Sequence, residues 1–194
     1  MSSQHLVAVI LGSNIDREHN LPAAVRLLSE ATNVIGVSTV YETIAVGSHQ
    51  QPNYFNAVVL LETELTPAEL KDGLLTMVEQ QLGRRRTADK YAPRTIDLDI
   101  VLYGDMDSDY IVVGDYIPAD GRPHHIPDPD LLRYLHSAVP VAELLPELKH
   151  PETGESLHSI AARLLAKASA GGEEPIRPRP DIDLQQVLDQ ASGR

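Results

Sequence analysis

The chain contains no cysteine and no tryptophan, and only one of its 194 residues is phenylalanine. Without cysteine it has no disulfides, no thiolate metal ligands and no cysteine nucleophile, and we expect a reducing compartment, the cytoplasm. No apolar run approaches the ~20 residues that cross a bilayer. Residues 1–5 also lack the basic and apolar stretches of a signal peptide, so we expect no association with a membrane.

Basic residues are scarce as well. The chain has 16 lysines and arginines against 28 aspartates and glutamates, and its formal net charge is −12. Proteins that bind nucleic acid over a wide area present a net positive surface, so we expect no nucleic-acid partner. Local basic clusters still permit a small phosphorylated ligand.

The most informative stretch is residues 94–103, Arg-Thr-Ile-Asp-Leu-Asp-Ile-Val-Leu-Tyr. Alternate side chains of a β-strand point to opposite faces, so Asp97 and Asp99 share one face while Leu98 points to the other. Two carboxylates at this spacing suit hard cations whose remaining ligands are phosphates and water, as is usual for Mg²⁺. On the Asp-x-Asp pattern alone, an edge strand with a solvated polar face is the favoured interpretation.

The scarce basic residues gather just before this strand. Five of the sixteen fall within eleven positions, and they are Arg84, Arg85, Arg86, Lys90 and Arg94. Guanidinium groups bind phosphate oxygens, and neighbouring carboxylates hold the cations that accompany polyphosphates. The cluster therefore favours a polyphosphate site over a solvated strand face.

The first hundred residues alternate between strand and helix patterns. The expected elements are strands at 6–11, 34–41, 54–62 and from 97, and helices at 20–31 and 66–82. The order β-α-β-β-α-β predicts an α+β fold with a ferredoxin-like sheet and both helices on one face. The other face is then open to a ligand or to further elements.

The rest of the chain is less regular. Residues 104–130 hold seven aspartates and one arginine, which indicates either a solvated excursion or a flap over the site. Extra C-terminal helices are expected at 131–145, 156–168 and 183–191. We expect one domain over residues 1–168, and a linker and tail over 169–194 whose last helix either docks on a neighbour or stays loose.

Five segments resemble sequence motifs of one family. They are Leu11-Gly-Ser-Asn14, Tyr41-Glu-Thr43, Gln51-Pro-Asn-Tyr-Phe-Asn-Ala57, Glu79 with Leu82-Gly-Arg84, and Ala92-Pro-Arg-Thr-Ile-Asp-Leu-Asp99 through Leu102-Tyr-Gly104. Together they resemble the 6-hydroxymethyl-7,8-dihydropterin pyrophosphokinases of the folate pathway. The resemblance covers about residues 5–105 and continues more weakly at 139–146, and its last segment is highly specific.

The resemblance implies transfer of the β,γ-diphosphate of ATP to the hydroxymethyl group of the dihydropterin, with release of AMP. It implies two Mg²⁺ ions on Asp97 and Asp99 and ATP as co-substrate. The residues implied as catalytic are Arg84, Arg94, Asp97 and Asp99. The positions implied for the pterin are Thr43, Val46, Tyr54 and Asn56. Those implied for ATP are Glu79, Arg84, Arg86, Tyr91, Arg94 and Ile100.

The partners implied are therefore small molecules, for a monomer or homodimer. Glu79 could equally be a plain ion-pair partner of Arg84 on its helix. A ferredoxin-like RNA-binding module is disfavoured, because the net charge is negative and no strand carries the aromatic pairs that stack on bases.

Four positions depart from the family's pattern, and one of them is Tyr91, which stands where the family has tryptophan. Asp128 stands where the family has histidine, Tyr134 where it has arginine, and His136 where it has a stacking aromatic residue. Residues that could compensate through a shift in register are His124, His125 and Arg133. Without compensation the nucleotide side is weakened, so the alternative hypothesis is a relative that binds nucleotide or pterin without turnover.

Overall fold

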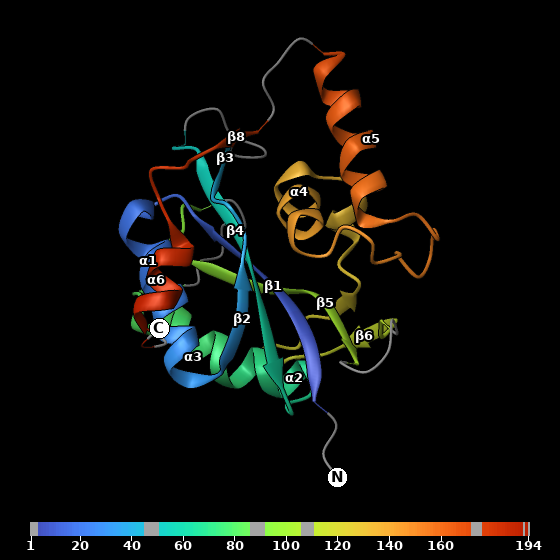
Figure 1. Ribbon diagram of the computed structural model, residues 1–194. Coiled ribbons are helices and arrows are strands. Elements are labelled where there is room, and N and C mark those ends of the chain that lie inside the picture. The colour runs from blue at the N-terminus through green and yellow to red at the C-terminus, as the bar shows by residue number, and fades with distance from the viewer. Residues whose placement is uncertain are drawn as a thin grey trace.

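The computed structural model describes residues 4–44, 51–85, 92–105, 111–171, 176–191 and 193. Its centre is an antiparallel sheet with helices on both faces (Figure 1). The strands of this sheet are β1 (His5–Ser13), β2 (Asn33–Val37), β3 (Tyr41–Thr43), β4 (Tyr54–Thr63), β5 (Asp97–Asp105) and β8 (Arg177–Pro178). The order across the sheet is β5-β1-β4-β3-β8, and β2 pairs with the same edge of β4 as β3 does. A separate hairpin joins β6 (Gly114–Tyr116) to β7 (His124–Ile126).

The strand expected at 34–41 is two strands, β2 and β3, and Ser38 explains the break. Its backbone amide donates to the carbonyl of Val58, while its hydroxyl accepts from the amide of Val58 at 2.9 Å. The side chain thus takes a hydrogen bond that a continued strand would supply from its backbone. Glu143 accepts from the amide of Thr39 next to it.

The helices are α1 (Arg17–Ala31), α2 (Pro67–Leu70), α3 (Thr76–Gln81), α4 (Leu135–Leu144), α5 (Leu157–Ser169) and α6 (Leu184–Ala191). A π-helical turn, η1 (Lys71–Leu75), joins α2 to α3, and a 3₁₀ turn, η2 (Pro129–Leu132), precedes α4. The helix expected at 66–82 is therefore present, but with a wider turn in its middle. In the described part of the chain, no helix combines the length and the apolar character that crossing a membrane requires.

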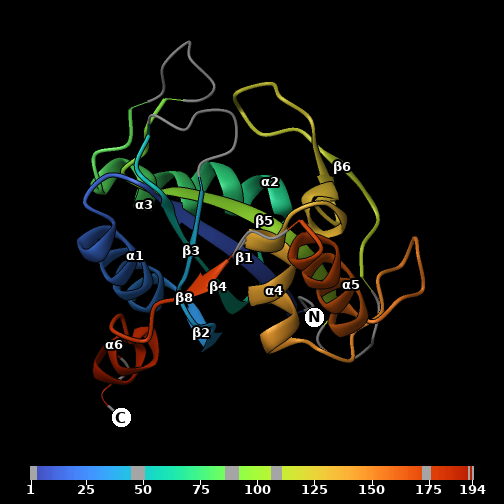
Figure 2. The same cartoon turned by 90° about the horizontal axis from the view of Figure 1, so that it is seen from above.

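The two-residue period of the strands divides the interior into two cores. Val7 and Val9 of β1 point to the core under α1 and α3, whereas Ala8 points to the core under α4 and α5. Figures 1 and 2 show these helices on opposite faces of the sheet. The sheet face that we expect from the sequence to be open to a ligand or to further elements is thus covered in part by α4 and α5. Because both faces are covered, most of β4 is buried.

The last helix docks on its own chain. Leu184 and Leu188 of α6 are only 2% and 4% exposed and belong to the core with residues of α1. Figure 2 shows α6 beside α1 and β8 beside β3. Residues 176–191 therefore return to the sheet after α5.

Replacing Leu188 by alanine tests this docking. We expect the free energy of unfolding to fall by about 2 kcal/mol, because a buried leucine is truncated. Leu165→Ala on α5, where the side chain is 36% exposed, is the control and should change it by less than about 0.5 kcal/mol. Urea denaturation of both variants measures the difference, and equal effects would mean that α6 is undocked in solution.

Candidate active site

A cavity of about 440 Å³ opens on the sheet face that α4 and α5 cover. It brings together most of the residues that the sequence singles out, from three parts of the chain. Its walls include Thr43, Tyr54 and Asn56 from β3 and β4, Arg94, Asp97 and Asp99 from β5 and the segment before it, and Asp128, Arg133, Tyr134 and His136 from the segment around η2.

The register of the sheet explains why these residues meet. Gly12 in β1 lies opposite Asp97 on one side and opposite Asn56 on the other. Side chains of directly opposed residues stand on the same face, so the carboxylate and the amide flank a residue without a side chain. A Cβ on Gly12 would lie 3.4 Å from Asn56 Oδ1. Gly12 therefore keeps the floor of the cavity open.

The alternation expected in β5 is confirmed. Leu98 and Ile100 are buried in the core, while the side chains of Asp97 and Asp99 face the cavity and are 20% and 33% exposed. The structure thus places Ile100 behind the strand, away from the cavity that its two acidic neighbours line.

Asp97 is held by two arginines. Arg94 Nη1 binds its Oδ2, and Arg84 Nη2 lies 3.5 Å from its Oδ1. Burial, followed by repulsion from Asp99, raises the pKa of Asp97, and the two guanidinium groups oppose that rise. The carboxylate and the phosphate-binding arginines predicted from the sequence are therefore in direct contact.

Asp99 is held by a residue that sequence reasoning missed. Lys71, on the π-helical turn, is 3% exposed and places Nζ 3.0 Å from Asp99 Oδ1 and 3.2 Å from Glu79 Oε1. Burial alone would raise the pKa of Asp99, but the ion pair with Lys71 lowers it. Glu79 also accepts from the amide of Leu98 at 2.9 Å, so it lies beneath β5 and not on the cavity wall.

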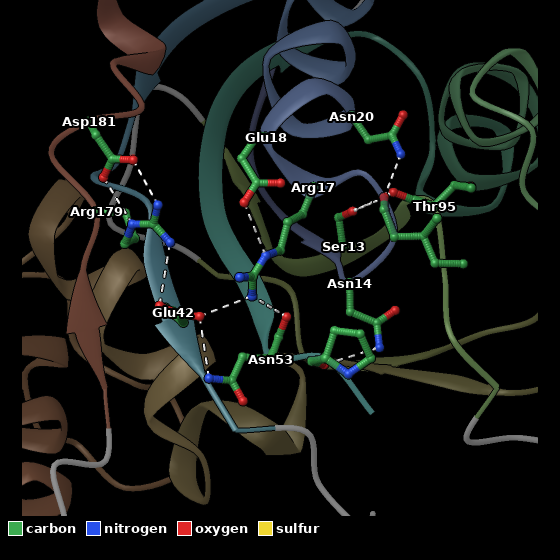
Figure 3. Close-up of polar contacts among 12 residues, drawn as sticks. Ser13, Asn14, Arg17, Glu18, Asn20, Glu42, Asn53, Thr95, Arg179 and Asp181 are labelled. Carbon is green, nitrogen blue, oxygen red and sulfur yellow. Dashed lines mark hydrogen bonds and ion pairs between the residues drawn. The ribbon is translucent and has the colours of Figure 1, made fainter. Parts of the chain in front are cut away.

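The segment before β5 is fixed by the turn after β1. Asn14 Oδ1 accepts from the amide of Arg94 at 2.7 Å, and the amide of Asn14 donates to the Arg94 carbonyl at 3.1 Å. Ser13 Oγ donates to the carbonyl of Thr95 at 2.6 Å (Figure 3). From the sequence, residues 11–14 stand out only as one of the family motifs, and the structure shows that this turn fixes the backbone position of Arg94.

The carboxylates suit a cation that arrives with phosphates. Among the described residues, no group of three or more His, Cys, Asp or Glu side chains could hold a metal by itself. Mg²⁺ is commonly bound by one or two carboxylates, with phosphate oxygens and water completing its shell. Asp97 and Asp99 on a cavity wall, with Arg94 beside them, match that donor set.

Comparison with known proteins agrees with this geometry. The sequence model of the 7,8-dihydro-6-hydroxymethylpterin-pyrophosphokinase family matches residues 8–146. The chain belongs to this family. A 2-amino-4-hydroxy-6-hydroxymethyldihydropteridine pyrophosphokinase of Bacillus subtilis (strain 168) is 32% identical over 174 residues, which are 87% of this chain and 95% of that protein. The protein of the same name from Synechocystis is 33% identical over 159 residues, 79% of this chain and 73% of that protein.

Solved structures agree in fold. The HPPK-DHPS of Plasmodium falciparum crystallised with pteroate superposes with a TM-score of 0.64 at 12% identity, over 88% of this chain and 44% of that one. The A437G form with STZ-DHP gives a TM-score of 0.71 at 11% identity, over 91% of this chain and 49% of that one. The chain thus spans about half the length of these solved chains.

Of the positions that depart from the pyrophosphokinase pattern, Asp128, Tyr134 and His136 line the cavity. Tyr134 and His136 stack with ring centroids 5.3 Å apart, and Arg133 lies beside them. Burial lowers the pKa of His136, which favours a neutral imidazole. Burial also raises the pKa of Asp128, to about 6. Arg133 is one of the residues that could compensate for these departures, and it adds a cation to the cavity wall.

The other two residues that could compensate, His124 and His125, do not line the cavity. His125 Nδ1 lies 2.6 Å from Asp115 in the β6–β7 hairpin, and the ring of His124 stacks on Tyr116. Three residues that the family pattern implies, Val46, Arg86 and Tyr91, lie outside the described residues.

Lys71 can be tested by removing its charge. Lys71→Met removes the buried cation that Glu79 and Asp99 share, and we expect the free energy of unfolding to fall by about 3 kcal/mol. Adding Glu79→Gln should recover part of this loss, because the glutamine oxygen still accepts from the amide of Leu98 while the buried charge at position 79 is removed. Denaturation of both variants, with exposed Lys167→Met as the control, measures the recovery. Equal losses in the single and double variants would contradict the pairing.

Asp128 predicts a pH-dependent stability. Its folded-state pKa of about 6 lies above the ordinary value of 3.8, so stability falls as pH rises through that interval and stays lower above it. Asp128→Asn cannot ionise and still accepts from the amide of Asp130. We expect it to be more stable than wild type at pH 7.5, by at most about 3 kcal/mol, and not at pH 4. Thermal unfolding at both pH values measures this, and a difference independent of pH would contradict it.

Proposed function

We propose that this protein transfers diphosphate from ATP to the hydroxymethyl group of 6-hydroxymethyl-7,8-dihydropterin and releases AMP, a step of folate biosynthesis. The supporting observation is one cavity whose walls include the carboxylates of Asp97 and Asp99, the guanidinium of Arg94, and the amide of Asn56 with the hydroxyl of Thr43 beside it. Because the chain belongs to the pyrophosphokinase family, we interpret these groups as the binding groups for ATP and the pterin. In the reaction, the substrate oxygen bonds to the β-phosphorus as the bond from that phosphorus to the oxygen bridging the α-phosphate breaks, and the hydroxyl loses its proton.

Asp97 and Asp99 are proposed to hold two Mg²⁺ ions. When bound, these ions neutralise phosphate charge and lower the pKa of the attacking hydroxyl. In the structure Arg84 and Arg94 bind Asp97. We propose that they bind phosphate oxygens instead when ATP enters the cavity. Arg86 and Tyr91 keep the ATP-side roles that the family pattern implies.

The pterin is proposed to lie at the end of the cavity whose wall β3 and β4 form. Asn56 offers a donor and an acceptor, which can read the amino-pyrimidinone edge of the heterocycle. Its Nδ2 donates to Thr43 Oγ1 at 2.8 Å, so the hydroxyl sets the orientation of the amide. The ring of Tyr54 can stack on the heterocycle, and Val46 keeps the contact that the family pattern implies.

The nucleotide base is proposed to lie near Arg133, Tyr134 and His136. A stacked phenol and a neutral imidazole give a flat surface, and the guanidinium of Arg133 supplies the positive charge. Glu79 and Ile100 are proposed to support the nucleotide site from beneath β5, without contact to ATP. Glu79 acts through its ion pair with Lys71, and Ile100 acts through its packing in the core.

We also propose a ferredoxin-like topology, which the order β5-β1-β4 with β2 and β3 beside β4 supports. Residues 1–168 would form the pyrophosphokinase domain and 169–194 the linker and tail. A monomer or homodimer in the cytoplasm stays the expectation from the sequence.

The decisive experiment supplies ATP, Mg²⁺ and the hydroxymethyl dihydropterin and follows AMP and the diphosphate ester by chromatography. Asp97→Ala or Asp99→Ala should lower kcat by about 100- to 1,000-fold or more, the loss expected for several kcal/mol of charge stabilisation. Exposed Asp189→Ala is the matched control and should keep wild-type activity. If wild-type protein forms no AMP, the assignment is wrong.

A further inference from the structure

Glu42, on β3, is bound by arginines from opposite ends of the chain. Arg17 Nη1 lies 3.0 Å from its Oε1, and Arg179 Nη1 lies 3.4 Å from its Oε2. Asn53 Nδ2 donates to Oε1 at 3.3 Å, and Figure 3 shows these side chains converging on the carboxylate. The carboxylate side chain is 16% exposed, so water screens these contacts less than it screens a surface pair.

The same two guanidinium groups lie over one aromatic ring. Arg17 Cζ is 3.8 Å and Arg179 Cζ is 4.4 Å from the centroid of Phe55, which is fully buried. Phe55 is paired with Glu42 across β3 and β4. Arg179 therefore contacts both strands at one register position, through charge and through the face of an aromatic ring.

Arg179 belongs to a segment that we call the C-terminal strap, residues 177–191. Arg177 and Pro178 form β8, which pairs with Tyr41 and Glu42 of β3. The amide of Arg179 donates to the carbonyl of Val40 at 2.8 Å, and Asp181 binds its Nε and Nη2 at 2.9 and 2.7 Å. The strap ends in α6, which is docked on α1, and all of it lies beyond the residues 8–146 that the family model matches.

The strap lies next to one end of the cavity only. Thr43, which lines the cavity, directly follows Glu42 and is paired with Tyr54. The order β5-β1-β4-β3-β8 separates the strap from Asp97 and Asp99 by three strands. A disturbance of the strap should therefore reach the Thr43 wall before it reaches the carboxylates.

We propose that the C-terminal strap fixes the cavity wall formed by β3, and that Arg179 is a positioning residue for the heterocyclic substrate. Arg179 does not line the cavity, so it acts through Glu42 and the β3 backbone. The inference rests on the proposed function, because that function assigns this wall to the pterin. The strap then determines the affinity for the pterin, whereas Asp97 and Asp99 act on ATP.

Arg179→Met tests this, because methionine keeps apolar contact with Phe55 and removes the charge. We expect the KM for the pterin to rise about fivefold, an effect of the size typical of residues that act through others. The kcat and the KM for ATP should change less than twofold. Arg179→Lys should restore part of the affinity. Arg163→Met is the matched control, because Arg163 on α5 also forms an ion pair, with Glu155, away from the strap. Its kcat and both KM values should stay at wild-type values.

Hydrogen exchange gives a readout that does not depend on turnover. In Arg179→Met, amides of residues 39–44 should exchange faster than in wild type, while those of residues 97–101 stay unchanged. If either the exchange of 39–44 or the pterin KM is unmoved, or if both KM values rise together, the strap has no such role. Failure of wild-type protein to form AMP would overturn the proposed function instead, and the exchange data would then still report on the strap.

Discussion

Lys71 connects the edge of the sheet to the cavity. Its ammonium donates to the carbonyl of Leu98 and pairs with Glu79 and Asp99, while Glu79 accepts from the amide of Leu98. An edge strand leaves one row of backbone groups without a partner strand, and buried groups of this kind need hydrogen bonds. One buried ion pair thus satisfies both polar groups of Leu98. The same cation keeps Asp99 ionised, because it lowers the pKa of that carboxyl against the effect of burial.

The sheet turns this local arrangement into a two-ended cavity. β1 lies between β5 and β4, and at Gly12 it contributes no side chain, so the groups of its two neighbours face one shared space. Acidic groups gather at the β5 end, and the amide and hydroxyl of Asn56 and Thr43 gather at the other. In the part of the chain that the structure describes, α4 and α5 cover this face of the sheet beside the cavity. Under the proposed function, ATP and the pterin therefore use different binding groups of the cavity.

The sequence predicts the site where a local pattern is enough. The alternation around Leu98 needs only the two-residue period of a strand, and it places both aspartates correctly. Lys71 has no such signal, because lysine is rarely buried and its partners lie distant in the sequence. The sequence leaves open whether the last helix docks or stays loose, because the residues of α1 that cover α6 lie at the other end of the chain. The break at Ser38 depends on a hydroxyl that replaces a backbone group, and a pattern of β-branched residues cannot show it.

The π-helical turn at Lys71–Leu75 has a consequence for comparing relatives. A π turn closes its hydrogen bonds between residues five apart, and so it accommodates one residue more than the regular helix on either side. Deleting one residue there would restore a regular α-helix and rotate the preceding residues by about 100° relative to α3. The ammonium at position 71 would then leave the edge of β5. Homologues whose alignments show a gap in this turn must therefore neutralise the second aspartate with a cation from elsewhere in the chain.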